Sequence, residues 1–143
     1  MKQFILSIAL LIAAFTASAQ DHVEPRWTFK HRDAILLTAY TESDSANVVN
    51  LSKKDLKAGK YFFTYTGVNK DSGLVRTLTI VDPADREVYQ CKEGSFTLTA
   101  KQLKKLIKDA KTLRIYTMAI PSDPAKAAIV RVRRVHLCTL QYR

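Results

Sequence analysis

The side chains best suited to metal binding or nucleophilic catalysis in this chain are three histidines and two cysteines. His136 and Cys138 lie two residues apart in an extended segment, a spacing that places both side chains on one strand face. Together with Cys91 they outline a zinc site that lacks a fourth ligand. A disulfide would use both sulfur atoms, so we expect no metal at these residues.

The two cysteines make up the whole cysteine content of the chain. An isolated pair usually forms a bridge in an oxidising compartment, so we predict a Cys91–Cys138 disulfide. In the chain-entropy model, closing a loop of this length stabilises the folded state by roughly 4 kcal/mol. The alternative is two separate thiols, one of them buried.

Familiar catalytic motifs are missing from the sequence: there is no Gly-x-Ser-x-Gly elbow, zinc-binding His-Glu-x-x-His helix or phosphate-binding glycine loop. This disfavours an enzyme, although triads assemble from residues far apart in sequence. A cleft holding His31 or His136 against a carboxylate and a hydroxyl would favour a hydrolase. Asp82, Asp85 and Glu87 gather near a turn, but their spacing departs from that of a calcium loop. We predict no catalytic residue and no cofactor.

Positive charge is the second chemical feature. The formal net charge is +10, from 23 lysines and arginines against 13 aspartates and glutamates. Such an excess attracts polyanions, including lipopolysaccharide, acidic glycans and nucleic acid. If a lysine-rich helix packs beside the last strand, one cationic binding surface forms from Lys101, Lys104, Lys105, Lys108, Arg131 and Arg133. The alternative is a solvated helix face with scattered arginines.

The lysines belong to the one segment with a clear helical pattern. Thr99 is the expected N-cap, and Gln102 three residues later completes a capping box. Four apolar residues then follow at helical spacing on one face: Leu103, Leu106, Ile107 and Ala110.

Short runs with strand patterns make up most of the remaining chain. The run 61–66 alternates so that three aromatic rings face inward and Phe62 faces solvent, where it could stack on a sugar or a partner side chain. The runs 61–66 and 74–81 flank turn residues and predict a hairpin. The last run, 129–142, changes phase at Arg133-Arg134, so we predict a β-bulge there, with Cys138 pointing away from the core.

Seven or more short strands and one late helix predict a mainly β protein, an antiparallel immunoglobulin-like β-sandwich with one short amphipathic helix. The segment Leu56-Lys57-Ala58-Gly59-Lys60-Tyr61 resembles the turn and strand start of many exported immunoglobulin-like modules. That resemblance implies a fold and no function. The alternative is an α+β fold, with one helix packed on an open antiparallel sheet.

The first residues predict export. A cationic start precedes an unbroken apolar run over 4–15, and Ala17-Ser18-Ala19 supplies the small residues that a signal peptidase reads. We predict a cleaved signal peptide over 1–19 and a single domain over 20–143. This domain would be periplasmic or secreted and would have no transmembrane segment. Export also disfavours nucleic acid as a partner.

Compartment, fold class and charge together predict a non-enzymatic binding or accessory module. Its partner would be an anionic glycan, lipopolysaccharide or a protein. Contact would run through the predicted cationic surface, or through pairing of a protein strand with an exposed sheet edge. The alternative function is a small periplasmic hydrolase whose site is assembled from distant residues.

Overall fold

The computed structural model describes residues 24–67 and 73–143, so the predicted signal peptide over 1–19 lies outside the described residues. The described elements, in chain order, are β1 (Arg26–His31), β2 (Ala34–Ala39), β3 (Val48–Leu51), β4 (Lys60–Thr66), β5 (Leu74–Val81), β6 (Glu87–Cys91), β7 (Ser95–Thr99), α2 (Ala100–Ala110), β8 (Thr112–Pro121), α3 (Pro124–Ala127) and β9 (Val135–Tyr142).

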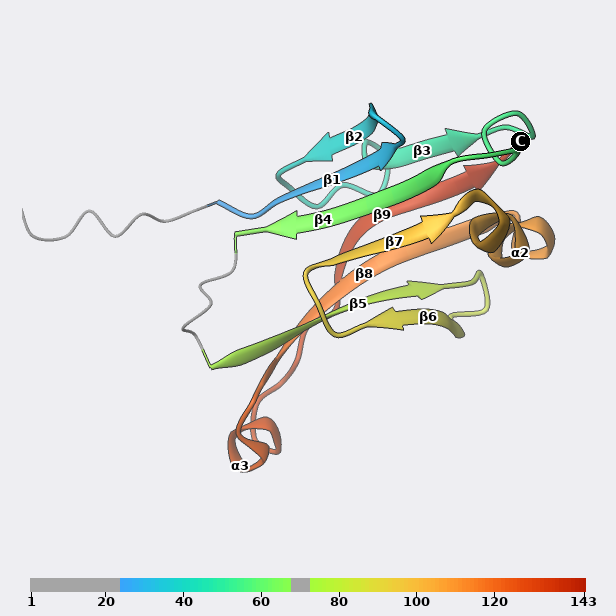
Figure 1. The fold of residues 1–143 in the computed structure, drawn as a ribbon. Helices are drawn as coiled ribbons and strands as arrows, with labels where there is room; N and C mark the ends of the chain where they lie inside the picture. Colours follow the sequence, from blue (N-terminus) through green and yellow to red (C-terminus); the bar gives the residue numbers. More distant parts are fainter. Residues whose placement is uncertain (1–23, 68–72) are drawn as a thin grey trace, which may run out of the picture.

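The strands form two sheets, with the orders β2-β1-β4-β7 and β3-β9-β8-β5-β6. Among the described strands, β3 and β9 are parallel and the other pairs are antiparallel. In Figure 1 the strands of both sheets run lengthwise, with α2 at one end of the molecule and α3 at the other. The predicted fold class, a mainly β sandwich with a short helix, is confirmed. An immunoglobulin-like topology is not, because these strand orders differ from those of immunoglobulin domains.

The core contains stacked aromatic rings from the four-stranded sheet. Phe63 is fully buried and stacks on Phe96, with 5.3 Å between ring centroids. Trp27 donates a hydrogen bond from Nε1 to the backbone oxygen of Leu137, at 2.7 Å, and so joins the two sheets. Phe62 is 38% exposed, as the strand alternation predicts. The pleat therefore places one face of β4 in the core and the other toward solvent.

Helix α2 forms where the sequence predicts it. The Thr99 side chain accepts from the backbone of Gln102, and the Gln102 side chain accepts in return from the backbone of Thr99. This capping box satisfies helix N–H groups that have no partner within the helix. Leu103 and Ile107 are fully buried, so burial of this apolar face holds the helix against the sandwich.

The predicted hairpin between the runs 61–66 and 74–81 is wrong. Strand β4 pairs with β1 and β7 in one sheet, whereas β5 pairs with β6 and β8 in the other. Turn residues between two strands show where the chain changes direction. They do not decide whether the next strand joins the same sheet or the opposite one.

The last strand is shorter than predicted. Strand β9 begins at Val135, and residues 129–134 form no strand. These residues, together with α3, connect β8 to the antiparallel β9. The predicted bulge at Arg133-Arg134 is therefore wrong, because this segment is part of the connection and has no partner strand.

The irregularity of β9 lies three residues later, at Leu137. Cys138 pairs with Ile115 of β8, but the next residue of β8, Tyr116, pairs with His136. Leu137 is thus the additional residue of a β-bulge. As a result Cys138 shares the core face with Ile115 and is fully buried, whereas the sequence predicted that it points away from the core.

The predicted disulfide is also wrong: Cys91 and Cys138 are both free thiols. Cys91 lies on β6 and Cys138 on β9, and the sheet order places β5 and β8 between these strands. Three strand spacings separate the cysteines by roughly 14 Å. A disulfide needs Cα atoms within roughly 7 Å of each other, so the bridge does not form in this fold.

We therefore expect unequal reactivity from the two thiols. In the native protein a water-soluble thiol reagent should label the half-buried Cys91 and leave Cys138 unlabelled, because burial raises the pKa of Cys138 to about 12. After unfolding without reductant, both should label, as mass spectrometry would show. The disulfide would be established instead if the unfolded chain stayed unlabelled and its mass were lower by that of two hydrogen atoms.

Candidate functional site

The structure separates the predicted cationic surface into two parts. The lysines of α2 lie at one end of the sandwich, whereas Arg131 and Arg133 follow α3 at the other (Figure 1). Strand β8 runs between the two ends and, at ten residues, spans roughly 30 Å. The six predicted residues therefore do not form one surface, because the helix packs beside the start of β8 and the arginines follow its end.

The two parts also differ in their charge balance. Arg133 forms an ion pair with Glu42, with 2.8 Å between Nη2 and Oε1. The neighbouring Arg134 forms another with Asp85, also at 2.8 Å, and its guanidinium lies over the ring of Tyr116. Carboxylates thus partly neutralise the arginine part, which makes it a weaker site for an external anion.

The α2 lysines instead join cations from two loops at the same end of the molecule. We call this group the basic end. It consists of ten exposed side chains: Arg32, Lys53, Lys54, Lys57, Lys60, Lys101, Lys104, Lys105, Lys108 and Lys111. Of these, the sequence prediction included only the four helix lysines at positions 101, 104, 105 and 108.

Hydrogen bonds to backbone oxygens hold the segments of the basic end together. The first residue of α2, Ala100, donates to the backbone oxygen of Gly59 at 2.9 Å, and Arg32 donates to that of Lys60 at 2.9 Å. The buried hydroxyl of Tyr61 donates to the backbone oxygen of Asp55 at 2.7 Å. The helix, the β1–β2 turn and the β3–β4 connection therefore have fixed relative positions, and their charges add to one local potential.

The basic end has few carboxylates of its own. Its segments contain Asp33, Asp55 and Asp109, and the carboxylate of Asp55 accepts from the backbone and hydroxyl of Ser52. In the part of the chain that the structure describes, none of the ten cations forms an ion pair. The basic end is therefore a concentration of exposed, uncompensated positive charge.

A second candidate site is a cavity of about 490 Å³ on the outer face of the five-stranded sheet. The residues that line it are Asp44, Thr112, Arg114, Tyr116, His136, Thr139 and Gln141. His136 Nε2 lies 2.9 Å from the hydroxyl of Thr139. His136 Nδ1 lies 2.9 Å from a carboxylate oxygen of Asp44, in a direction that does not meet the geometry of a hydrogen bond. A carboxylate, an imidazole and a hydroxyl thus lie next to one another.

The bulge at Leu137 creates this arrangement. Residues three apart on a regular strand face opposite sides, but the extra residue turns His136 and Thr139 to the same side. It also separates His136 from Cys138, which faces the core. His136 and Cys138 therefore do not share a strand face, as the zinc site outlined from the sequence would require. The described residues contain no group of three or more potential ligands that could hold a metal.

The environment of His136 favours its neutral form. Burial lowers the pKa of His136; the carboxylates of Asp44 and Glu42 raise it, and the guanidinium of Arg114 lowers it further. In the unfolded chain the pKa returns to an ordinary value near 6.5. The unfolded state therefore takes up a proton at a higher pH than the folded state does.

We consequently expect the free energy of unfolding to fall as the pH drops below about 6.5, until the folded-state pKa is reached. His136→Gln should flatten this part of the pH profile, as measured by urea unfolding at a series of pH values. The other two histidines are present in both proteins and serve as the internal reference. An unchanged pH profile in the variant would assign the effect to other groups.

The turn with Asp82, Asp85 and Glu87 was considered as a calcium site, but two of its carboxylates bind groups of the protein itself. Asp82 accepts hydrogen bonds from the backbones of Ala84 and Arg86, and it pairs with the Arg86 guanidinium at 2.7 Å. The bonds from Arg86 lower the pKa of Asp82. Asp85 pairs with Arg134 instead. Asp82 therefore fixes the β5–β6 connection, and Asp85 joins this connection to the segment before β9.

No protein-family model, curated protein or solved structure matches this chain. The fold and the geometry of its sites are therefore the basis for inferring its function. Among the described residues, no helix is long and apolar enough to cross a membrane.

Proposed function

We propose that this protein is an exported, non-enzymatic binding module that attaches to an acidic glycan or to lipopolysaccharide through the basic end. The observation that supports this proposal is the gathering of ten exposed cations, none with an ion-pair partner in the described part of the chain. The predicted signal peptide places such acidic polymers within reach of the protein.

The basic end is suited to a polymer more than to a small anion. Its cations lie on three segments of fixed relative position. A chain with regularly spaced charges can contact many of them at once and releases its counterions on binding. The affinity should then fall steeply as the salt concentration rises, because the contacts are mainly electrostatic and depend little on the shape of the ligand.

The experiment compares two variants with equal charge. The first replaces the exposed α2 lysines: Lys101→Gln, Lys104→Gln, Lys105→Gln and Lys108→Gln. The second removes four exposed cations from the opposite end: Lys92→Gln, Lys126→Gln, Arg131→Gln and Arg133→Gln. Glutamine is a good helix former, so α2 should remain folded in the first variant. Calorimetric titration with heparin, then with lipopolysaccharide, gives the affinities.

We expect the α2 variant to lose roughly 10- to 100-fold in affinity at low salt, with a smaller dependence on salt. The opposite-end variant should change by no more than a few fold. Equal losses in both variants would show that net charge alone drives binding. Absence of binding by the unaltered protein would refute the proposed ligand class and would leave a protein partner as the better hypothesis.

A second candidate function, hydrolysis, is favoured by one observation: His136 lies between the Thr139 hydroxyl and the Asp44 carboxylate in a cavity. In this mechanism Thr139 Oγ1 attacks a carbonyl carbon, the bond to the leaving group breaks, and the hydroxyl proton passes through His136 Nε2 to that group. Water then cleaves the acyl-threonine and restores the hydroxyl. However, the hydroxyl belongs to a buried residue, and the Asp44 side chain is 93% exposed. These features make hydrolysis the weaker candidate.

Nitrophenyl acetate tests the hydrolase directly. If the site is catalytic, the protein should turn over this ester above the background rate, and Thr139→Val should remove roughly a thousandfold or more of the activity. Valine has nearly the same shape as threonine, so the variant should fold. Thermal unfolding verifies this. Turnover that is absent, or unchanged in the variant, would exclude this mechanism for the ester.

A further inference from the structure

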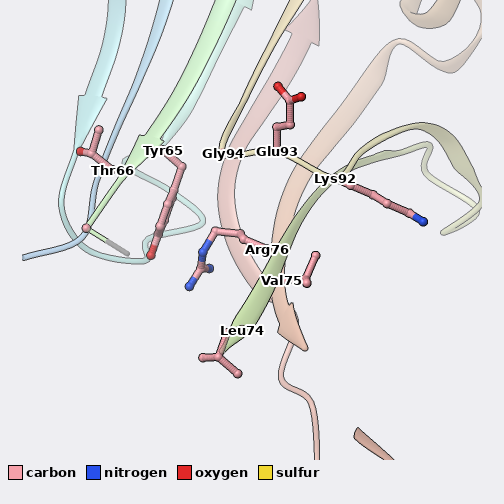
Figure 2. A pocket seen from close by; sticks show the side chains of 9 residues that line it. Tyr65, Thr66, Leu74, Val75, Arg76, Lys92, Glu93 and Gly94 are labelled. Carbon is pink, nitrogen blue, oxygen red and sulfur yellow. The ribbon is translucent and has the colours of Figure 1, made fainter. Parts of the chain in front are cut away.

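A cavity of about 490 Å³ opens at the end of the sandwich opposite α2. Its walls come from the end of β4, the start of β5 and the β6–β7 connection (Figure 2). The residues that line it are Tyr65, Thr66, Gly67, Leu74, Val75, Arg76, Lys92, Glu93 and Gly94. The volume is within the range of small-molecule sites in proteins.

Arg76 is the central charged residue of this cavity. Its guanidinium carbon lies 4.5 Å from the centroid of the Tyr65 ring, and its Nη1 donates to the hydroxyl of Thr117 at 3.1 Å. The Thr117 hydroxyl donates in turn to the backbone oxygen of Thr77. The ring and the hydroxyl therefore hold the half-buried cation in one position.

The guanidinium retains unused donors. Of its five N–H groups, the described structure pairs one with a side-chain acceptor, and no described carboxylate forms an ion pair with Arg76. Glu93 lines the same cavity but forms no ion pair with Arg76. A partly desolvated cation that no described carboxylate pairs with favours an incoming anion. A carboxylate fits best, because it can accept two parallel hydrogen bonds from a guanidinium.

Apolar surface lies next to this cation. Leu74 is 41% exposed and Val75 is 42% exposed. Figure 2 shows the Arg76 side chain reaching toward Tyr65, with Leu74 close by, whereas Lys92 points away from both. Leu74 shares a strand face with Arg76, so a ligand that placed its anionic group on Arg76 would cover Leu74 with the rest of its body.

We propose that this cavity binds a small carboxylic acid with an apolar or aromatic body. The carboxylate pairs with the Arg76 guanidinium, and the apolar body lies against Leu74 and Tyr65. The site is separate from the basic end, so it gives the module a second ligand that does not depend on the polyanion.

Phenylacetate and octanoate serve as probes, with phenylacetamide as the neutral analogue of the first. Titrations followed by NMR should shift the resonances of the cavity residues, and phenylacetamide should bind at least about tenfold more weakly than phenylacetate. Arg76→Met should weaken phenylacetate binding by roughly 10- to 100-fold. Lys126→Met is the matched control, because it removes an exposed cation of α3 that does not line the cavity, and it should leave the affinity within about twofold.

A second variant keeps the proposal testable if Arg76→Met fails to fold. Leu74→Asp places a negative charge beside the site at an exposed position and should also weaken phenylacetate binding by roughly tenfold or more. Equal binding of acid and amide would refute recognition of the carboxylate. Equal losses in Arg76→Met and Lys126→Met, shifts confined to other regions, or no binding of either acid would refute the site. Loss of phenylacetate binding in the α2 variant with retention in Arg76→Met would assign the acid to the basic end.

Discussion

Replacing Phe63 with alanine is expected to lower the free energy of unfolding by about 3 to 5 kcal/mol. Phe63 is fully buried between the sheets. Its ring stacks on that of Phe96 and lies next to the tilted ring of Phe29. The substitution removes apolar contacts and leaves a cavity that the surrounding rings cannot fill completely. Urea unfolding followed by tryptophan fluorescence measures the loss, since Trp27 is the single tryptophan of the chain.

The matched control is Phe62→Ala, one position earlier on the same strand. Phe62 faces solvent, so its removal should cost less than about 1 kcal/mol. Similar losses for both variants would mean that the outer face of β4 is covered in solution. Such a result would point to a partner or a second copy on that face.

Replacing Gly67 with alanine should destabilise the protein by more than about 2 kcal/mol. Gly67 has a φ angle of +103°, a conformation that side chains with a Cβ rarely adopt. A Cβ built there would lie 2.6 Å from the Cα of Pro25, and this neighbour is backbone that cannot rotate away. Thermal and urea unfolding of the variant measure the combined cost of strain and overpacking.

Gly73 provides the comparison for this position. It has a φ angle of +62°, and among the described residues the nearest atom to an added Cβ is the Ser122 hydroxyl at 4.0 Å. Gly73→Ala should therefore cost only about 1 kcal/mol, the penalty of the left-handed backbone itself. If the two variants lose equal stability, then the contact of Gly67 with Pro25 does not constrain the fold.

Features that depend on neighbouring residues followed directly from the sequence. Helix α2 is one example: the Thr99–Gln102 capping box and the spacing of Leu103 and Ile107 lie within one segment and determine its start and its buried face. The alternation along β4, which buries Phe63 and exposes Phe62, is another. Both patterns concern contacts over a few residues, where side-chain period and backbone hydrogen bonding leave few alternatives.

Pairings between distant segments could not be obtained in the same way. The strand order places two strands between Cys91 and Cys138, so cysteine content and compartment alone gave the wrong bridge. The bulge at Leu137 depends on the register between β8 and β9, and it decided that Cys138 faces the core and that His136 faces Thr139. A shift of one residue exchanges the two faces of a strand, and local sequence constrains it weakly.

The candidate sites show the same division. The sequence by itself determined that the chain is strongly basic, mainly β and has one helix with an exposed lysine face, because composition and periodicity are local properties. Only the tertiary structure decided which cations lie together: it placed Arg131 and Arg133 at the end opposite α2, and it brought the lysine-bearing β3–β4 connection to the same end as the helix. It likewise placed Arg76 against Tyr65, eleven residues earlier and in the other sheet. Sheet order and chain crossings set these positions, through contacts that close only when the whole core is formed.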